Sequence, residues 1–131
     1  MANGKTNTTN TSGEKNMKLA YIAGPYRATT PHKTQLNIDR AREVALKMWK
    51  SSYAVICPHM NSAHFDGECD DTQWLLGYLE ILKRCDLMVL LPNWLDSRGT
   101  IEEVNLAFKE GIPTYVFKDN TLYLFTELEG E

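Results

Sequence analysis

The sequence predicts an α/β fold, in which an open parallel sheet of four to five strands is covered by helices on both faces. Short apolar runs of β type alternate along the chain with segments that have a helical apolar stripe. The spacing between runs leaves room for a crossover helix, and such crossovers are right-handed. The most uniformly apolar run, residues 86–91, fits a central parallel strand that is buried on both faces.

The first half of this alternation runs from residue 18 to residue 70. An apolar run at 18–23 predicts a strand that ends at Gly24 and Pro25. Residues 35–50 predict an amphipathic helix, because apolar side chains recur at helical spacing at Ile38, Ala41, Ala45 and Met48. A second strand is expected at 53–57. The polar loop at 59–70 that follows is long for a compact α/β unit, which indicates a functional loop.

The second half repeats the pattern. Asp70 and Asp71 suit a helix start, and the stripe that follows comprises Leu75, Tyr78, Leu79 and Leu82. After the strand at 86–91, a helix is expected from about residue 100 to residue 110, with Gly111 as its C-terminal cap. Further strands are predicted at 113–117 and 121–125.

Length and composition predict one globular domain. The chain has 131 residues, of which 43% are hydrophobic and 24% charged. Residues 1–16 contain no large apolar side chain after Met1, so we expect a disordered polar tail there and a single domain at 17–131.

Charge and cysteine content narrow the possible partners and the compartment. Fourteen Lys and Arg against 17 Asp and Glu give a net charge of −3, which argues against a broad basic surface for long nucleic acid or a membrane. There is no apolar run of membrane-spanning length and no signal-peptide core. Three cysteines without CxxC spacing do not suggest a disulfide scaffold. We therefore expect a cytoplasmic protein.

The ligand site is expected where strands end. Parallel α/β sheets bind ligands at the carboxyl ends of their strands, which here are followed by residues 24–27, 58–70 and 92–103. Gly24 allows a ligand to approach the backbone, and Arg27 suits a phosphate. The alternative is an ordinary Gly-Pro turn beside a solvated arginine. The segment has neither dinucleotide-binding nor P-loop spacing.

The loop after the third strand contains two candidates. Thr100 and Glu103 fit a capping box, which is a purely structural role. Alternatively, Glu103 is a nucleophile in the first helical turn, with Ser97 and backbone N–H groups holding an anion. Asp86 opens its strand, so its position alone places it at the opposite edge of the sheet.

Metal binding is disfavoured, and we expect no metal and no cofactor. Cys57, His59, His64 and Cys69 lack the paired spacing of zinc ligands. His59, His64 and Asp66 are better explained as polar groups of a substrate loop. Trp49 and Trp74 suit the core, whereas Trp94 falls in a ligand loop where it suits stacking on a planar base.

Four motifs, taken in order, resemble those of the nucleoside 2-deoxyribosyltransferase superfamily, including its 2′-deoxynucleoside 5′-phosphate N-hydrolases. The match spans residues 18–117. The motifs are Tyr21-Ile-Ala-Gly24-Pro25-Tyr, then Pro58-His59-Met-Asn61, then Cys85-Asp86, and finally Ser97-x-Gly99-Thr100-x-x-Glu103-x-x-x-Ala107. The resemblance implies a flavodoxin-like (Rossmann-like) three-layer fold with five parallel strands. It also implies a homo-oligomer whose neighbouring subunits help to complete each site.

The resemblance implies roles for individual residues as well. Glu103 takes the place of the nucleophilic glutamate, Tyr21 orients that carboxylate, and Asp86 helps to protonate the departing base. Ser97 and Arg27 correspond to phosphate-binding positions and favour a nucleotide over a nucleoside. We expect the substrate to be bound by the residues of these motifs and loops: Gly24, Pro25, Arg27, His59, Asn61, Trp94, Ser97 and Gly99.

The expected function is that of an N-glycosidase acting on 2′-deoxynucleoside 5′-monophosphates. A base-exchanging deoxyribosyltransferase is the alternative within the same class. A protein that only binds a nucleotide or an ADP-ribose-like ligand is the alternative outside it, because Pro25 replaces a phosphate-binding serine and Asn105 replaces a common glycine. The apolar residues 122–125 also suggest a homo-oligomer.

Overall fold

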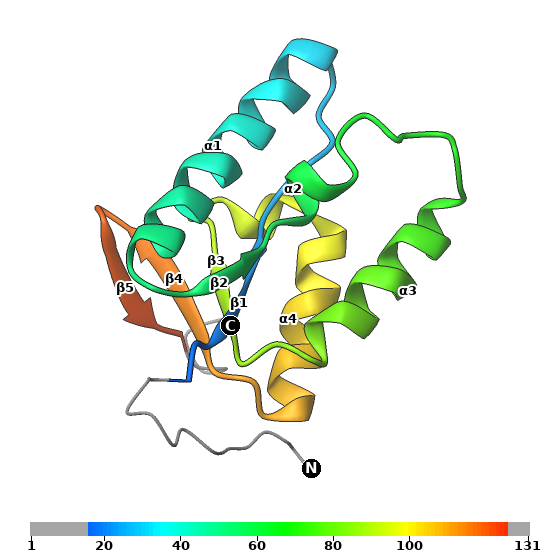
Figure 1. The fold of residues 1–131 in the computed structure, drawn as a ribbon. Helices are drawn as coiled ribbons and strands as arrows, with labels where there is room; N and C mark the ends of the chain where they lie inside the picture. The colour runs from blue at the N-terminus through cyan, green and yellow to red at the C-terminus, as the bar shows by residue number, and fades with distance from the viewer. Residues whose placement is uncertain (1–15, 126–131) are drawn as a thin grey trace.

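A five-stranded sheet with helices on both faces organises residues 16–125, the part of the chain that the computed structural model describes (Figure 1). The strands are β1 (Leu19–Ala23), β2 (Ala54–Ile56), β3 (Leu87–Leu90), β4 (Thr114–Lys118) and β5 (Thr121–Leu124). The helices are α1 (Pro31–Lys50), α2 (Pro58–Asn61), α3 (Asp71–Leu82) and α4 (Arg98–Glu110), with a 3₁₀ turn, η1, at Trp94–Asp96. The predicted tail, apart from Asn16, lies outside the described residues.

The strand order β2-β1-β3-β4-β5 confirms the predicted α/β fold. Strands β1 to β4 are parallel, whereas β5 runs antiparallel to β4, so the expectation of a fifth parallel strand is wrong. The reason is the short connection through Asp119 and Asn120, both of which have positive φ. A two-residue turn of this kind closes a hairpin, and parallel neighbours need a much longer crossover.

The alternation of side chains along β1 divides the core between the two faces of the sheet. Ala20 and Ile22 point to the face covered by α1, where they pack with Ala41 and Val44. Tyr21 and Ala23 point to the other face, which α3 and α4 cover (Figure 1). The three layers are therefore α1, the sheet, and the pair α3 and α4, and Tyr21 is directed toward α4.

The start of α4 differs from the prediction and moves Glu103 along the helix. The side chain of Ser97 accepts a hydrogen bond from the Thr100 N–H, so Ser97 is the N-cap and the helix begins at Arg98. The predicted capping box of Thr100 and Glu103 is therefore wrong, and Glu103 lies in the second turn. The helix ends as predicted at Gly111, which has the left-handed φ of 72°.

Gly24 is required by packing and not only by the turn. A Cβ at this position would lie 2.5–2.9 Å from three side-chain atoms of Leu91, the residue that follows β3. Leu91 itself is buried in the core against α1. The absence of a side chain at Gly24 therefore lets the end of β1 lie close to the end of β3.

We expect Gly24→Ala to lower the free energy of unfolding by about 1–3 kcal/mol, because overpacking forces neighbouring atoms apart. Urea unfolding followed by circular dichroism measures the change. The matched control is Gly77→Ala on α3, where an added Cβ meets nothing within 4 Å. That substitution should stabilise the helix by about 0.5–1 kcal/mol. Equal effects at the two sites would contradict this explanation.

Within residues 16–125, no helix is both long enough and apolar enough to cross a membrane.

Candidate active site

A cavity of about 550 Å³ opens at the carboxyl ends of β1 and β3. From these neighbouring strands the chain continues to opposite faces of the sheet, to α1 after β1 and to α4 after β3. Such a switch in strand order is where open α/β sheets bind ligands, and the volume suits a small molecule. Of the predicted substrate-binding residues, five line the cavity: Gly24, Arg27, His59, Ser97 and Gly99.

Glu103 lines the cavity, and Tyr21 meets it from behind the cavity wall. Glu103 projects from α4 and is only 9% exposed, and Tyr21 projects from β1 and is completely buried. The Tyr21 hydroxyl donates a hydrogen bond to Oε2 of Glu103. The structure therefore brings together the two residues that the resemblance paired, from positions 82 residues apart in the sequence.

Burial sets the protonation of this pair. Loss of solvent raises the pKa of Glu103 to about 7, although the hydrogen bond from Tyr21 acts in the opposite direction. Burial and the adjacent Glu103 also raise the pKa of Tyr21 well above its usual value, so the phenol remains a hydrogen-bond donor. Near neutral pH the carboxyl group is thus divided between its protonated and ionised forms.

His59 lines the cavity as a neutral side chain. Its Nε2–H donates to the carbonyl oxygen of Pro25 at 2.9 Å, since a carbonyl can only accept. Burial lowers the pKa of His59, which favours the uncharged ring. Pro25 does not line the cavity. Instead of contacting a ligand, Pro25 fixes the orientation of the His59 imidazole through its carbonyl oxygen.

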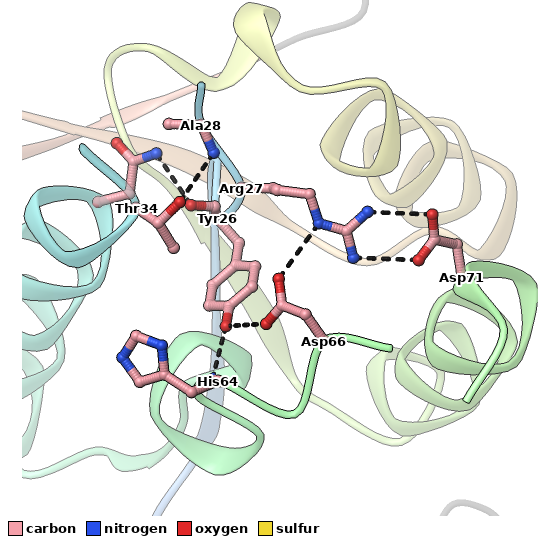
Figure 2. Close-up of polar contacts among 8 residues, drawn as sticks. Tyr26, Arg27, Ala28, Thr34, His64, Asp66 and Asp71 are labelled. Carbon is pink, nitrogen blue, oxygen red and sulfur yellow. Dashed lines mark hydrogen bonds and ion pairs between the residues drawn. The ribbon is translucent and has the colours of Figure 1, made fainter. Parts of the chain in front are cut away.

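Arg27 is held between two carboxylates (Figure 2), and it lines the cavity. Its terminal nitrogens bind both oxygens of Asp71 at 3.0 Å, and its Nε lies 3.3 Å from Asp66. Arg27 lowers the pKa of Asp71, so the ionised form of that carboxyl is favoured. The structure thus engages the predicted phosphate ligand with two acidic side chains, and an anion there would compete with both.

The same network holds the polar loop over the cavity. The Tyr26 hydroxyl donates to Asp66 at 2.7 Å and accepts from the His64 backbone N–H at 2.6 Å (Figure 2). The hydrogen bond from Tyr26 is the main cause that lowers the pKa of Asp66. His64 also contacts Gln35 of α1 at 2.9 Å. These contacts place the loop residues Phe65 and Asp66 in the cavity wall.

The N-terminus of α4 forms the other polar wall. Ser97, Arg98 and Gly99 all line the cavity there. Ser97 Oγ accepts from the Thr100 N–H at 3.1 Å, which leaves its own hydrogen available to a ligand. Arg98 is exposed and makes no hydrogen bond or ion pair with another described side chain. A helix N-terminus with a hydroxyl and an unpaired guanidinium suits an anionic group.

The aromatic wall of the cavity is not the one expected from the sequence. Trp94 is buried in the core, where it packs edge-on against Phe125 with centroids 5.2 Å apart, and it does not line the cavity. Phe65 and Trp74 line it instead, with their rings 6.1 Å apart. Trp74 shares a helical stripe with Leu75 and Tyr78, and this end of the stripe faces the cavity. In the sequence, the sign that Trp74 faces the cavity was that its helical stripe begins directly after the long polar loop at 59–70.

Two further predicted residues lie outside the cavity lining. Asp86 is exposed at the amino end of β3, at the opposite edge of the sheet, where its Oδ2 accepts from the Leu19 N–H at 2.8 Å. The structure therefore does not bring Asp86 to Glu103, because the carboxylate binds the N–H at the amino end of β1 instead. Asn61 is exposed and donates to the Tyr78 hydroxyl at 3.1 Å, so it supports a cavity residue.

The fold is that of an α/β protein similar to a 2-deoxyribosyltransferase of known structure. A 2-deoxyribosyltransferase from the psychrotolerant bacterium Bacillus psychrosaccharolyticus has a similar fold, with a TM-score of 0.58 and 17% identity over 85% of this chain and 79% of that one. A conserved protein from Enterococcus faecalis is similar at a TM-score of 0.56 and 22% identity, over 79% of this chain and 65% of that one. Both likenesses are distant and establish the fold.

The family follows from the sequence match. Residues 17–116 match the family described as a domain of unknown function, DUF4406, and the chain belongs to it. No curated protein matches the sequence.

Proposed function

We propose that this protein cleaves the N-glycosidic bond of 2′-deoxynucleoside 5′-monophosphates, with Glu103 as the nucleophile. The observation that supports this proposal is the buried Glu103 carboxyl group, which lines a cavity of about 550 Å³ and is hydrogen-bonded to Tyr21. A buried carboxyl group with a displaced pKa in a cavity is typical of a reacting group. The likeness to a 2-deoxyribosyltransferase fold supports the same class of chemistry.

The reaction would follow the two-step course of retaining glycosidases. Ionised Glu103 attacks the anomeric carbon as the bond to the base breaks, and the resulting ester is then released by water. Tyr21 holds the carboxylate through Oε2, which leaves the other oxygen for attack. The rings of Phe65 and Trp74 offer a stacking surface to the departing base.

The phosphate would lie against the start of α4. Ser97, Arg98 and Gly99 supply a hydroxyl, a cation and backbone N–H groups in one wall of the cavity. One observation favours a second candidate, a base-exchanging transferase that acts on uncharged nucleosides. Arg27 is already paired with Asp66 and Asp71, which would repel a second anion at that end.

The test is incubation with the four deoxynucleoside monophosphates and the four deoxynucleosides, scored by chromatography for free base. We expect base release from at least one monophosphate, and a fall on the order of 10³-fold or more with Glu103→Ala. Base exchange without hydrolysis, measured with a second free base present, would favour the transferase. Ligand recovered unchanged from every mixture would overturn both and leave a binding protein.

Asp86→Asn is the matched control for this experiment. Its side chain can still accept the hydrogen bond from the Leu19 N–H, and it lies at the edge of the sheet opposite the cavity. We expect base release at the rate of the parent. A loss as large as that of Glu103→Ala would contradict the placement of the active site at the carboxyl ends of the strands.

A further inference from the structure

The proposed reaction needs a proton donor for the departing base, and most acidic groups of the cavity are committed elsewhere. Glu103 is the proposed nucleophile, and it accepts the hydrogen bond that the Tyr21 hydroxyl donates. Asp66 and Asp71 have lowered pKa values, because Tyr26 and Arg27 favour their charged forms. His59 is neutral, and its N–H is directed at a carbonyl. The remaining carboxyl groups in the wall, Asp96 and Glu102, are exposed at its rim.

Tyr78 is the other phenol of the cavity wall, and its hydroxyl meets the Pro58 carbonyl oxygen only at 3.5 Å, the outer limit of a hydrogen bond. It projects from α3 and is only partly exposed. Tyr78 packs against the buried core cluster that contains Tyr21, so the two phenols lie on the same face of the sheet. Tyr78 thus lies on the same cavity wall as Trp74, which is one helical turn earlier on α3.

Two neighbours direct the hydrogen of this phenol. Asn61 Nδ2 donates to the Tyr78 oxygen at 3.1 Å, and the Ser62 hydroxyl lies 2.6 Å from it. The Ser62 hydroxyl also lies 3.4 Å from the Pro58 carbonyl oxygen, so its much shorter contact is the one to Tyr78. When Ser62 donates to Tyr78, both lone pairs of the phenol are used, and its own hydrogen has only the 3.5 Å contact to the Pro58 carbonyl oxygen, which a ligand can displace. This arrangement accounts for Asn61, which the motif singled out and which does not itself line the cavity.

We propose that Tyr78, positioned by Asn61 and Ser62, is the group that donates a proton to the departing base. The inference rests on the function proposed above. As Glu103 forms its bond to the anomeric carbon, the electron pair of the glycosidic bond passes to the base nitrogen and the Tyr78 proton passes to the base. In the second step water attacks the anomeric carbon, the ester bond to Glu103 breaks, and the proton of that water returns to the Tyr78 oxygen.

The test compares leaving groups. An N7-methylated deoxyguanosine monophosphate loses its base as a neutral molecule without a proton, whereas the unmethylated nucleotide needs a donor. We expect Tyr78→Phe to lower kcat on the unmethylated nucleotide by about 10²-fold or more, which is the usual contribution of general acid catalysis. On the methylated nucleotide the loss should be less than about threefold, since no proton is required.

Tyr26→Phe is the matched control, because it removes a second cavity phenol whose hydrogen is given to Asp66. We expect it to affect both nucleotides to the same degree. Equal losses on both nucleotides with Tyr78→Phe would overturn the assignment, since a merely structural role does not depend on the leaving group. Asn61→Ala, a second variant, should show a smaller loss with the same dependence.

The same measurements separate the two levels of the proposal. If wild-type protein releases no base from either nucleotide, the proposed function fails and this inference fails with it. If wild-type protein releases base and Glu103→Ala does not, but Tyr78→Phe retains the rate of wild-type protein on both nucleotides, only the role of Tyr78 is wrong.

Discussion

At pH 8 the Glu103→Gln variant is expected to be more stable than the parent by about 3 kcal/mol. Burial raises the pKa of Glu103 from 4.5 to about 7 in the folded protein. Between these two values the unfolded chain has released the proton and the folded protein still holds it. The parent therefore loses stability as pH rises from about 4.5 to about 7, and the loss is complete above the folded pKa. Glutamine avoids it, because it has no charge to bury.

Urea unfolding at pH 4, 6 and 8 measures this difference. The two proteins should be nearly equally stable at pH 4, where the glutamate is protonated in both states, and should diverge as pH rises. The matched control is Glu102→Gln, the exposed neighbour on the same helix, for which we expect a change within about 0.5 kcal/mol at each pH. A parent as stable as Glu103→Gln at pH 8 would show that the carboxyl group ionises without cost.

Base release is expected to rise with pH to a midpoint near 7, because only the ionised form of Glu103 can attack. The hydrogen bond from Tyr21 lowers the pKa of Glu103, so Tyr21→Phe should move this midpoint to higher pH. On the acid side of the profile, each unit of displacement lowers the rate about tenfold. We therefore expect the loss of activity in Tyr21→Phe to be greatest at low pH and smaller on the alkaline plateau.

The measurement is kcat/KM for base release between pH 5 and pH 9, with the substrate identified by the panel. Tyr26→Phe again serves as the control, because its hydroxyl contacts Asp66 and His64 and not Glu103. Its midpoint should match that of the parent. A midpoint in Tyr21→Phe at or below that of the parent would contradict the role of the phenol in favouring the carboxylate.

These two expectations have one physical origin. The environment that destabilises the ionised form of Glu103 also keeps water away from it, so a nucleophile that costs stability reacts more readily when it is ionised. The completely buried Tyr21 and the sheet that holds it limit the cost by supplying one hydrogen bond in place of the lost water.

Local patterns in the sequence predicted the strands and the three long helices, whereas the short helix α2 lies in a segment that was expected to be a loop. The apolar run at 86–91 predicted β3, since a strand buried on both faces has no polar alternation. Gly111 predicted the end of α4 because a left-handed cap favours glycine. The start of α4 was misplaced, because Ser97 and Thr100 are both good capping residues and only the backbone geometry distinguishes them.

The site was predictable only in part. The strand ends indicated its location, and the motifs indicated Glu103 and Tyr21. The ion pairs of Arg27 join the loop after β1 to Asp66 and to Asp71 at the start of α3, which lie 39 and 44 residues away in the sequence, and no local pattern contains such contacts. Trp74 and Trp94 both lie beside loops, so the sequence does not distinguish them. Only the packing of α3 and η1 decides that Trp74 lines the cavity and Trp94 is buried.

The sequence by itself determined the order of the strands and of the long helices α1, α3 and α4, the strand ends at which the ligand site lies, and the presence of a carboxyl group there. These features depend on periodicity, caps and turns along a continuous segment. The tertiary structure decided the protonation of Glu103, the partners of Arg27, the removal of Asp86 and Trp94 from the site, and the presence of Tyr78 in it. The reason is that burial and hydrogen bonding across elements depend on how distant segments pack together.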